Sequence, residues 1–268
     1  MTMMLSPDLL DRRALALLAL VDMFGTPIVS PVTVTAAGVR VLAKREGRIA
    51  VLEAPGFAAH ASAFAAPPAT PALRSKHIAL DLTPIDGTLL PRRHVLRLPR
   101  NADPALKSDP LSLFQAEKIV FSAAPPVRMS GNACIVRVSV RRDDGACIEH
   151  ALVRARSADS VHTAWALTDA AGEAALVFPA LPISFPGGGG TTLAAIGGSV
   201  IVTVDPTVAR FTDPAELGEA RRAAASRTVD HPDPDAIAAA NAPVFAAGTS
   251  VQLSAGTQPA VALQWTAP

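Results

Sequence analysis

The chain has 268 residues, of which half are apolar and 18% charged, and its formal net charge is +1. This length can bury one large hydrophobic core or two of ordinary size. Because the charges nearly cancel and the arginines are scattered through strand-like segments, the composition argues against a nucleic-acid-binding surface. Frequent prolines and glycines between short apolar runs are typical of an all-β chain.

The N-terminal residues imitate an export signal without its defining features. Arg12 and Arg13 precede an apolar run, but acidic residues interrupt the positive leader and no small-x-small cleavage site follows. The apolar run from Ala14 to Val21 is also much shorter than the ~20 residues of a membrane-spanning helix. We therefore expect residues 14–22 to form the first strand of a cytoplasmic protein that has no membrane partner.

Short apolar runs separated by turn residues predict a series of strands in the first part of the chain. They cover residues 14–22, 31–36, 38–44, 48–53, 77–83, 93–99 and 117–122. Residues 59–76 are rich in Pro and Ala and poor in large apolar side chains, so we expect a long loop or arm there. A second Pro-rich stretch, residues 122–132, predicts a boundary between domains.

Beyond this boundary the strand pattern restarts. The expected strands are residues 133–142, 147–156, 161–168, 173–178, 199–205, 249–254 and 259–265. A helical insertion is expected near residues 213–227, because Asp213 can cap it and Pro214 suits its first position. Residues 228–244 are interpreted as a loop with room for one further helical turn. The predicted architecture is therefore all-β, with domains at residues 1–125 and 126–268.

Two cysteines, Cys134 and Cys147, are the only candidates for a disulfide. If residues 138–150 fold as a hairpin with Asp144 and Gly145 at its tip, the two sulfur atoms lie too far apart to bond. We expect two buried free thiols that behave as small apolar groups.

The two parts of the chain show weak internal similarity. Aligning Gly25 with Gly145 places a strand before each glycine and an isoleucine, Ile28 or Ile148, three residues after it. Further on, "REGRIAVLEAPG" (45–56) aligns with "AAGEAALVFPAL" (170–181). In each segment a glycine, Gly47 in the first, is followed by a short apolar strand and then by a proline. Because the matches recur in the same order, they predict a duplicated unit.

The stretch "WALTDAAGEAALVFPAL" predicts a strand, a turn and a second strand. Trp165 is expected on the inner face of strand 161–168, where alternate side chains point into the core. Asp169 can accept hydrogen bonds from the neighbouring backbone and Gly172 tolerates a positive φ, so together they close the turn. Phe178 then continues the inner face on the next strand.

This part of the chain resembles the transthyretin-like, carboxypeptidase-regulatory-like β-sandwich family. The residues that match its pattern are Asp143, Gly145, Ala151, Val153, Thr168, Asp169, Gly172 and Pro179. The resemblance covers residues 133–205, and more faintly 14–56, and implies two Ig-like or transthyretin-like β-sandwiches. The chain departs from the family at Cys147 and Ile148, where members usually carry Pro-Leu.

Other motifs fit catalytic or ligand sites poorly. The tetraglycine within residues 183–192 lacks the Lys and the following helix of a phosphate-binding loop, so we expect a hairpin tip. The histidines never fall at metal-ligand spacings, and alternating prolines at 230–235 stiffen that acidic stretch against a weak Ca²⁺ site. Ser160, His162 and Asp169 lack a nucleophile elbow. We therefore expect no catalytic residue, no metal and no cofactor.

The basic segment "LPRRHVLRLPR" (90–100) has two interpretations. It is either a solvated edge strand that discourages aggregation or a site for an anionic partner. Its arginines and a C-terminal aromatic form the candidate interaction surface, which is Arg92, Arg93, Arg97, Arg100 and Trp265.

The sequence favours a non-catalytic assembly protein that binds other protein subunits. The first-half pattern, followed by the basic segment at 90–100, is similar to accessory β-sandwich proteins of phage-tail-like contractile injection particles. That resemblance implies another particle protein as the partner. The alternative is a module that binds carbohydrate or another surface polymer, which would need Phe57, Phe64 or Trp265 to be exposed.

Overall fold

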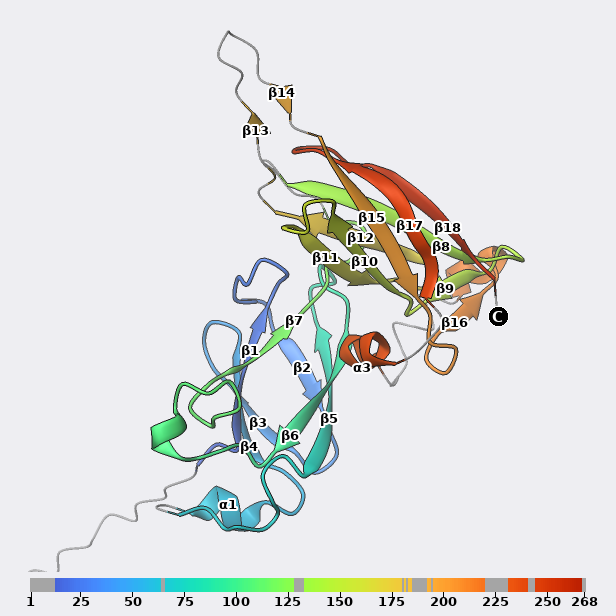
Figure 1. The fold of residues 1–268 in the computed structure, drawn as a ribbon. Helices are drawn as coiled ribbons and strands as arrows, with labels where there is room; N and C mark the ends of the chain where they lie inside the picture. The colour runs from blue at the N-terminus through green and yellow to red at the C-terminus, as the bar shows by residue number, and fades with distance from the viewer. Residues whose placement is uncertain are drawn as a thin grey trace, which may run out of the picture.

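The computed structural model describes residues 13–63, 66–127, 133–179, 181, 183–184, 192–193, 195–219, 231–240 and 244–266, with the backbone alone for 183–184, 192–193 and 244–248. The chain is built mainly of β-strands, as the sequence predicts, and they gather into two groups (Figure 1). None of the helices in these ranges has the length and apolar character needed to cross a bilayer.

The first half contains two sheets that enclose one cluster of buried apolar residues. Its strands are β1 (Ala16–Val21), β2 (Val32–Thr35), β3 (Arg40–Ala43), β4 (Arg48–Glu53), β5 (Lys76–Pro84), β6 (Arg92–Leu98) and β7 (Glu117–Val120). The sheet orders are β3-β4-β1-β7 and β2-β5-β6. Leu18, Leu80, Leu96 and Phe121 lie fully buried between them. A short helix, α1 (Ala58–Ser62), and a 3-10 turn, η1 (Pro104–Leu106), lie in the connections.

The second half repeats this plan around a second apolar cluster. Its strands are β8 (Cys134–Arg142), β9 (Cys147–Glu149), β10 (Leu152–Ser157), β11 (Thr163–Leu167), β12 (Glu173–Phe178), β13 (Ile183–Ser184), β14 (Thr192–Leu193), β15 (Ile196–Thr203), β16 (Arg210–Thr212), β17 (Val244–Leu253) and β18 (Ala260–Trp265). One sheet has the order β11-β10-β15-β17, and the other is β12-β8-β9-β16 with β18 also paired to β8. Val136, Val153, Phe178 and Val202 meet in the interior, so Phe178 is a core residue as predicted.

The internal similarity seen in the sequence is confirmed by identical backbone pairing. The Leu20 amide donates to the Gly47 carbonyl at 2.8 Å, and the Val140 amide donates to the Gly172 carbonyl at the same distance. β4 is antiparallel to β1 as β12 is to β8, and β7 is parallel to β1 as β18 is to β8. The two halves therefore share the order and direction of these strands.

The two predicted glycine turns also match. The Gly25 amide donates to the Asp22 carbonyl at 3.0 Å and the Gly145 amide to the Arg142 carbonyl at 2.9 Å, and both glycines have positive φ. Cys147 follows the second turn and, like Cys134, is a buried free thiol, as expected.

The two halves differ in the sheet that one pair of equivalent strands, β3 and β11, joins. β3 pairs with β4, whereas β11, which stands at the equivalent place in the chain, pairs with β10 in the opposite sheet. The strands next to them correspond, because β2 pairs with β5 in the same antiparallel way that β10 pairs with β15. As a result β10 has a neighbour on both sides, and β2 is the outermost strand of its sheet.

The single strand predicted at 147–156 is in fact two strands. His150 has a φ of +67°, a conformation that ends an extended strand. β9 therefore stays in the sheet of β8, and the chain crosses to the other sheet as β10. The hydrophobic pattern of the segment is continuous across this crossing, so it contains no signal for the break.

The prediction for Trp165 was wrong about which face of β11 is inside. Ala164 and Ala166 belong to the main apolar core of the second half, whereas Trp165 is half-buried on the outer face with Leu167. That outer face is covered by α3 (Pro234–Ala239), whose Ile237 is fully buried there. The large ring therefore packs outside the main core of the second half, and small residues fill the inner face of β11.

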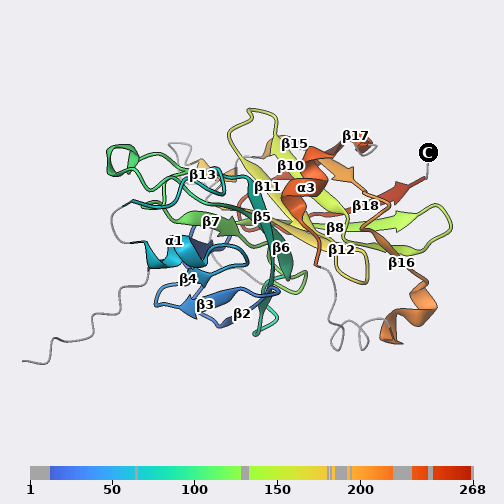
Figure 2. The same cartoon turned by 90° about the horizontal axis from the view of Figure 1, so that it is seen from below.

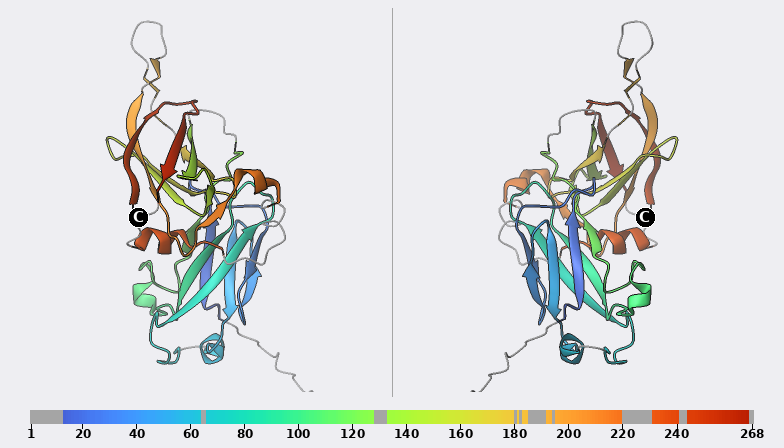
Figure 3. Two further views of the ribbon diagram at one scale, coloured as in Figure 1. Left: turned by 90° about the vertical axis from the view of Figure 1, so that its right-hand side faces the viewer. Right: turned by 90° about the vertical axis from the view of Figure 1, so that its left-hand side faces the viewer.

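The segment around α3 also joins the two halves (Figures 2 and 3). The Arg93 amide on β6 donates to the Pro232 carbonyl at 2.9 Å, and the Thr83 hydroxyl on β5 lies 2.8 Å from His231 Nε2. Ile237 contacts the second half through Leu152. Residues distant in sequence thus cover the outer edge of β6.

The predicted helical insertion begins as expected. Asp213 accepts a hydrogen bond from the Ala215 amide at 2.8 Å and caps η2 (Pro214–Glu216), with Pro214 in its first turn. The remainder of the insertion, from residue 220 to 227, lies outside the described residues. The further helical turn expected within 228–244 is α3.

Candidate interaction loop and the buried arginines

The structure separates the four arginines of the candidate surface. The side chains of Arg92 and Arg100 are each only 4% exposed, so neither belongs to an open surface. Arg93 is half-buried and forms a bidentate ion pair with Asp81 at 2.9 Å. Arg97 alone of the four is exposed. Alternation along β6 explains the difference, because Arg92 shares the inward side of the strand with buried leucines.

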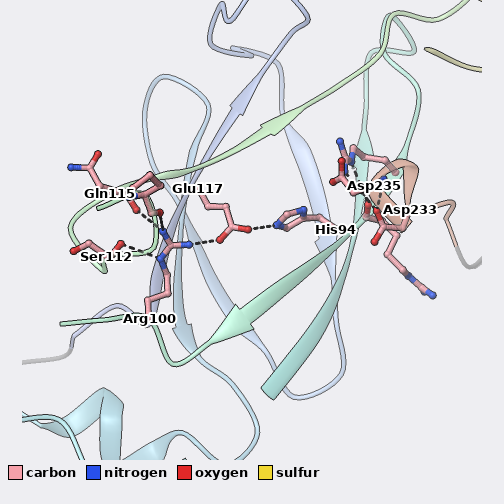
Figure 4. A network of polar contacts seen from close by, with 10 residues as sticks. His94, Arg100, Ser112, Gln115, Glu117, Asp233 and Asp235 are labelled. Atoms are coloured by element: carbon pink, nitrogen blue, oxygen red, sulfur yellow. Dashed lines mark hydrogen bonds and ion pairs between the residues drawn. The ribbon is translucent and has the colours of Figure 1, made fainter. Parts of the chain in front are cut away.

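Arg100 lies at the centre of a buried polar network (Figure 4). Its Nε donates to the Ser112 carbonyl at 3.1 Å and its Nη2 to the Pro110 carbonyl at 2.6 Å. Its Nη1 pairs with the Glu117 carboxylate, whose other oxygen lies 2.8 Å from His94 Nε2. A guanidinium has five donors in a fixed fork, which suits it to bind several carbonyls and a carboxylate at once.

The charge of Glu117 is stabilised by this network. Burial alone would raise the pKa of Glu117, but hydrogen bonding and charge from His94 and Arg100 outweigh it and hold the pKa below its ordinary value. Glu117 is therefore ionised near neutral pH and compensates the buried charge of Arg100. Both charged groups of the network, the Arg100 guanidinium and the Glu117 carboxylate, have hydrogen-bond partners, as burial of a charge requires.

The network orders residues 101–116, here named the interaction loop, which connect β6 to β7. Its own side chains add short-range support, since Asp103 accepts from the Ala105 amide at 2.8 Å and Asp109 from the Leu111 amide at 2.7 Å. On its outer side three large apolar residues are exposed, namely Leu106 at 45%, Leu111 at 42% and Phe114 at 54%. The loop therefore holds apolar side chains in water on a fixed backbone.

Arg92 links the two halves of the chain. Its Nη1 donates to the Val120 carbonyl at 2.7 Å and its Nη2 pairs with Asp235 of α3 at 2.8 Å. The guanidinium also lies over the ring of Trp165, with its central carbon 5.9 Å from the ring centroid. Sequence reasoning missed this role, because Asp235 and Trp165 are distant in the chain and nothing local points to them.

Trp265 is not a surface residue either. It is 3% exposed, belongs to the core of the second half, and stacks on Phe211 with centroids 5.8 Å apart. β18 pairs with β8, and its last residue, Trp265, lies opposite Arg142 in that pairing. Phe57 is fully buried as well, and Phe64 lies outside the described residues.

Two acidic residues of the stretch 230–235, Asp233 and Asp235, bind groups within the chain. Asp233 caps α3 by accepting from the Asp235 amide at 3.0 Å, and Asp235 pairs with Arg92. Among the residues that the structure describes, no group of His, Cys, Asp and Glu is arranged to hold a metal ion. Residue 230 and the tetraglycine lie outside that set.

Ser160 and Asp169 do not form a catalytic group with His162. They lie beyond opposite ends of the five-residue strand β11, which by itself separates its two ends by about 13 Å at ~3.3 Å per residue. Asp169 instead accepts from the Ala171 amide at 2.8 Å and the Glu173 amide at 3.0 Å, and so closes the turn predicted at Gly172.

A pocket of about 640 Å³ lies where the two halves meet. Its wall contains prolines and leucines together with a set of polar and charged residues, which are Arg137, Glu149, His150, Thr168, Asp169 and Glu173. Burial lowers the pKa of His150 to about 4, so its ring is neutral at physiological pH, and its Nδ1 faces the Val208 carbonyl at 3.4 Å. His150 and Asp169 are thus used within the fold.

Comparison with known proteins gives no family for this chain. A scan against protein-family models, a search of curated proteins and a search of solved structures found no match.

Proposed function

We propose that this chain is a non-catalytic assembly protein that binds other protein subunits. In this proposal residues 1–125 and 126–268 form two transthyretin-like β-sandwich domains, the second with the helical insertion. The two apolar clusters and the repeated pairing around Gly47 and Gly172 support the division.

The observation that carries the proposal is the interaction loop. A loop that holds Leu106, Leu111 and Phe114 in water loses apolar contacts that a partner could supply. Because the buried side chain of Arg100 already fixes its carbonyls, little backbone entropy remains to be lost on binding. An ordered apolar loop at one end of a rigid sandwich is suited to docking against another subunit.

The partner that we propose is a subunit of a phage-tail-like contractile particle, assembled in the cytoplasm. The first-half sequence pattern, which includes strand β4 and the basic strand β6, supports this choice of particle. The side chains of Arg92 and Arg100 are buried and bond within the chain, so they are not accessible to a partner. We therefore place the contact with the partner subunit on the interaction loop.

The test is purification of the tagged chain from its native host, with and without a change in the loop. We expect particle subunits to co-purify in fixed ratio and to be identified by mass spectrometry. Phe114→Asp should abolish their recovery, whereas Val161→Asp should retain it, because Val161 is also exposed, at 72%, but lies in the second half. A chain that always migrates alone contradicts the proposal.

The carbohydrate-binding alternative has lost two of the three aromatic residues that prompted it, and the third, Phe64, lies outside the described residues. Trp265 and Phe57 are buried and offer no platform for a sugar ring. Glycan-array binding that depends on exposed Phe114 would favour this alternative over the assembly role.

A further inference from the structure

The two halves differ at one sheet edge, and the second half shows what the first half lacks. In the second half the edge of β10 is covered by antiparallel β11, from Thr163 to Leu167. In the first half the equivalent strand, β3, has paired with β4 instead, and β2 is left at the edge of its sheet. Within the described ranges no strand pairs with β2 on the side away from β5.

The backbone of β2 offers free hydrogen-bonding groups on that side. The Ile85 amide donates to the Pro31 carbonyl at 3.1 Å, and bonding alternates along an antiparallel strand. Thr33 therefore bonds to β5, whereas the N–H and C=O groups of Val32 and Val34 point away from the sheet. Unpaired groups in a row form a template for another strand.

This edge also lacks the protection found at two other edges of the fold, those of β6 and β3. The edge of β6 is covered by the segment at Pro232, and exposed β3 begins with the charged residue Arg40. The sequence of β2 is Val-Thr-Val-Thr, which contains no charge, no proline and no glycine. Charges and prolines are the usual means of preventing strand addition.

The first residue of β2 lines an open hollow whose wall is partly apolar and partly charged. The hollow has a volume of about 510 Å³, and its wall includes Val29, Pro31 and Val32 together with Lys44, Arg45, Glu46 and Arg48 at the turn from β3 to β4. Val29 is 90% exposed and Ile85, which bonds to Pro31, is 67% exposed. Among the described residues of the first half, these are the two large apolar side chains with the highest exposed fractions, and both lie beside the start of β2.

We propose that β2 pairs antiparallel with β2 of a second copy of this chain, which gives a twofold dimer with a continuous sheet. A twofold axis through Thr33 brings Val32 opposite Val34 of the partner subunit, so the free groups of both strands bond to each other. Thr33 then faces Thr33 of the partner subunit, a favourable cross-strand pair. The self-complementary, uncharged sequence is why a second copy is chosen over a different protein. The inference is independent of the proposed assembly role.

Charge-swapped variants test the pairing in the full chain. By analytical ultracentrifugation we expect the unmodified chain to be a dimer and Thr33→Lys and Thr33→Glu each to be monomers, because like charges would face each other across the axis. An equimolar mixture of the two variants should regain the dimer. Thr163→Lys, on the exposed edge strand β11, is the matched control and should remain dimeric.

A covalent readout checks the register directly. Facing residues of a non-hydrogen-bonded antiparallel pair lie close enough for a disulfide. Oxidised Thr33→Cys should therefore give a covalent dimer on a non-reducing gel and Thr163→Cys should not; the native thiols are buried and do not interfere. The proposal is overturned if the unmodified chain sediments as a monomer throughout the micromolar range, or if Thr33→Lys stays dimeric.

Discussion

Gly47 and Gly172 make the same close contact in the two halves of the chain. A Cβ built on Gly47 would lie 2.8 Å from the carbonyl oxygen of Leu20, and one built on Gly172 would lie 2.4 Å from that of Val140, the equivalent residue. Both glycines have positive φ, and the carbonyl of each glycine accepts a hydrogen bond from the first strand of its half. Backbone against backbone at this distance leaves no space that a side chain could use.

Alanine at either glycine should therefore destabilise the chain strongly. We expect Gly47→Ala and Gly172→Ala each to lower the free energy of unfolding by about 3 kcal/mol or more, from a strained φ and a clash together. Gly25→Ala and Gly145→Ala are the controls, since both have positive φ but nothing within 4 Å of the added Cβ, and should cost only about 1 kcal/mol. Urea unfolding measures the difference; equal losses at all sites would contradict the packing argument.

The free energy of unfolding should decrease as the pH is lowered below 6.5, because His150 is buried in its neutral form. Its folded pKa of about 4 lies below the ordinary 6.5, so the unfolded chain binds more protons between these values. The contribution is fully present above pH 6.5 and is lost as pH falls toward 4, with a slope of at most about 1.4 kcal/mol per pH unit. His150→Asn, which tolerates the positive φ, should flatten this part of the unfolding profile. An unchanged slope in the variant would show that another group is responsible.

Arg92 should hold α3 against both halves. We expect Arg92→Met to lower the free energy of unfolding by about 1–3 kcal/mol, because the Val120 carbonyl and Asp235 lose their shared donor. Limited proteolysis should then cut within 231–240 more rapidly. Arg97→Met removes an exposed arginine of the same strand and should change neither measurement.

Arg100 should control the order of the interaction loop. Arg100→Met leaves the Glu117 carboxylate and the carbonyls of Pro110 and Ser112 without their donor. We expect faster hydrogen exchange at amides of residues 109–115 and weaker recovery of partner subunits, with Arg97→Met again as the control. Exchange that stays as slow as in the unmodified chain would mean that the loop is ordered by its own turns.

Acidification should loosen the same loop. Because the pKa of Glu117 is lowered from its ordinary 4.5, its stabilising charge is present above that value and is lost as pH falls through the lower folded pKa. Hydrogen exchange in residues 109–115, corrected for the intrinsic pH dependence, should therefore rise below pH 4.5. Glu117→Gln should show the looser loop already at neutral pH.

Local patterns in the sequence predicted the strands and their turns. The alternation and flanking glycines of residues 48–53 and 173–178 gave the bounds of β4 and β12, and Asp213 with Pro214 gave the start of η2. These features depend on neighbours within a few residues, which a sequence displays directly. The duplication was visible for the same reason, since glycine turns recur in order.

Only the tertiary structure decided which side of a strand is inside and what covers the other side. Trp165 packs on the outer face of β11 because α3, residues 234–239, covers that face, and the buried Arg92 finds its ion-pair partner, Asp235, on the same helix. β3 pairs with β4 in one sheet, and as a consequence β2 has no neighbouring strand on one side in the other sheet, within the described residues. Such outcomes depend on contacts between residues far apart in the chain, whose energies no local pattern contains.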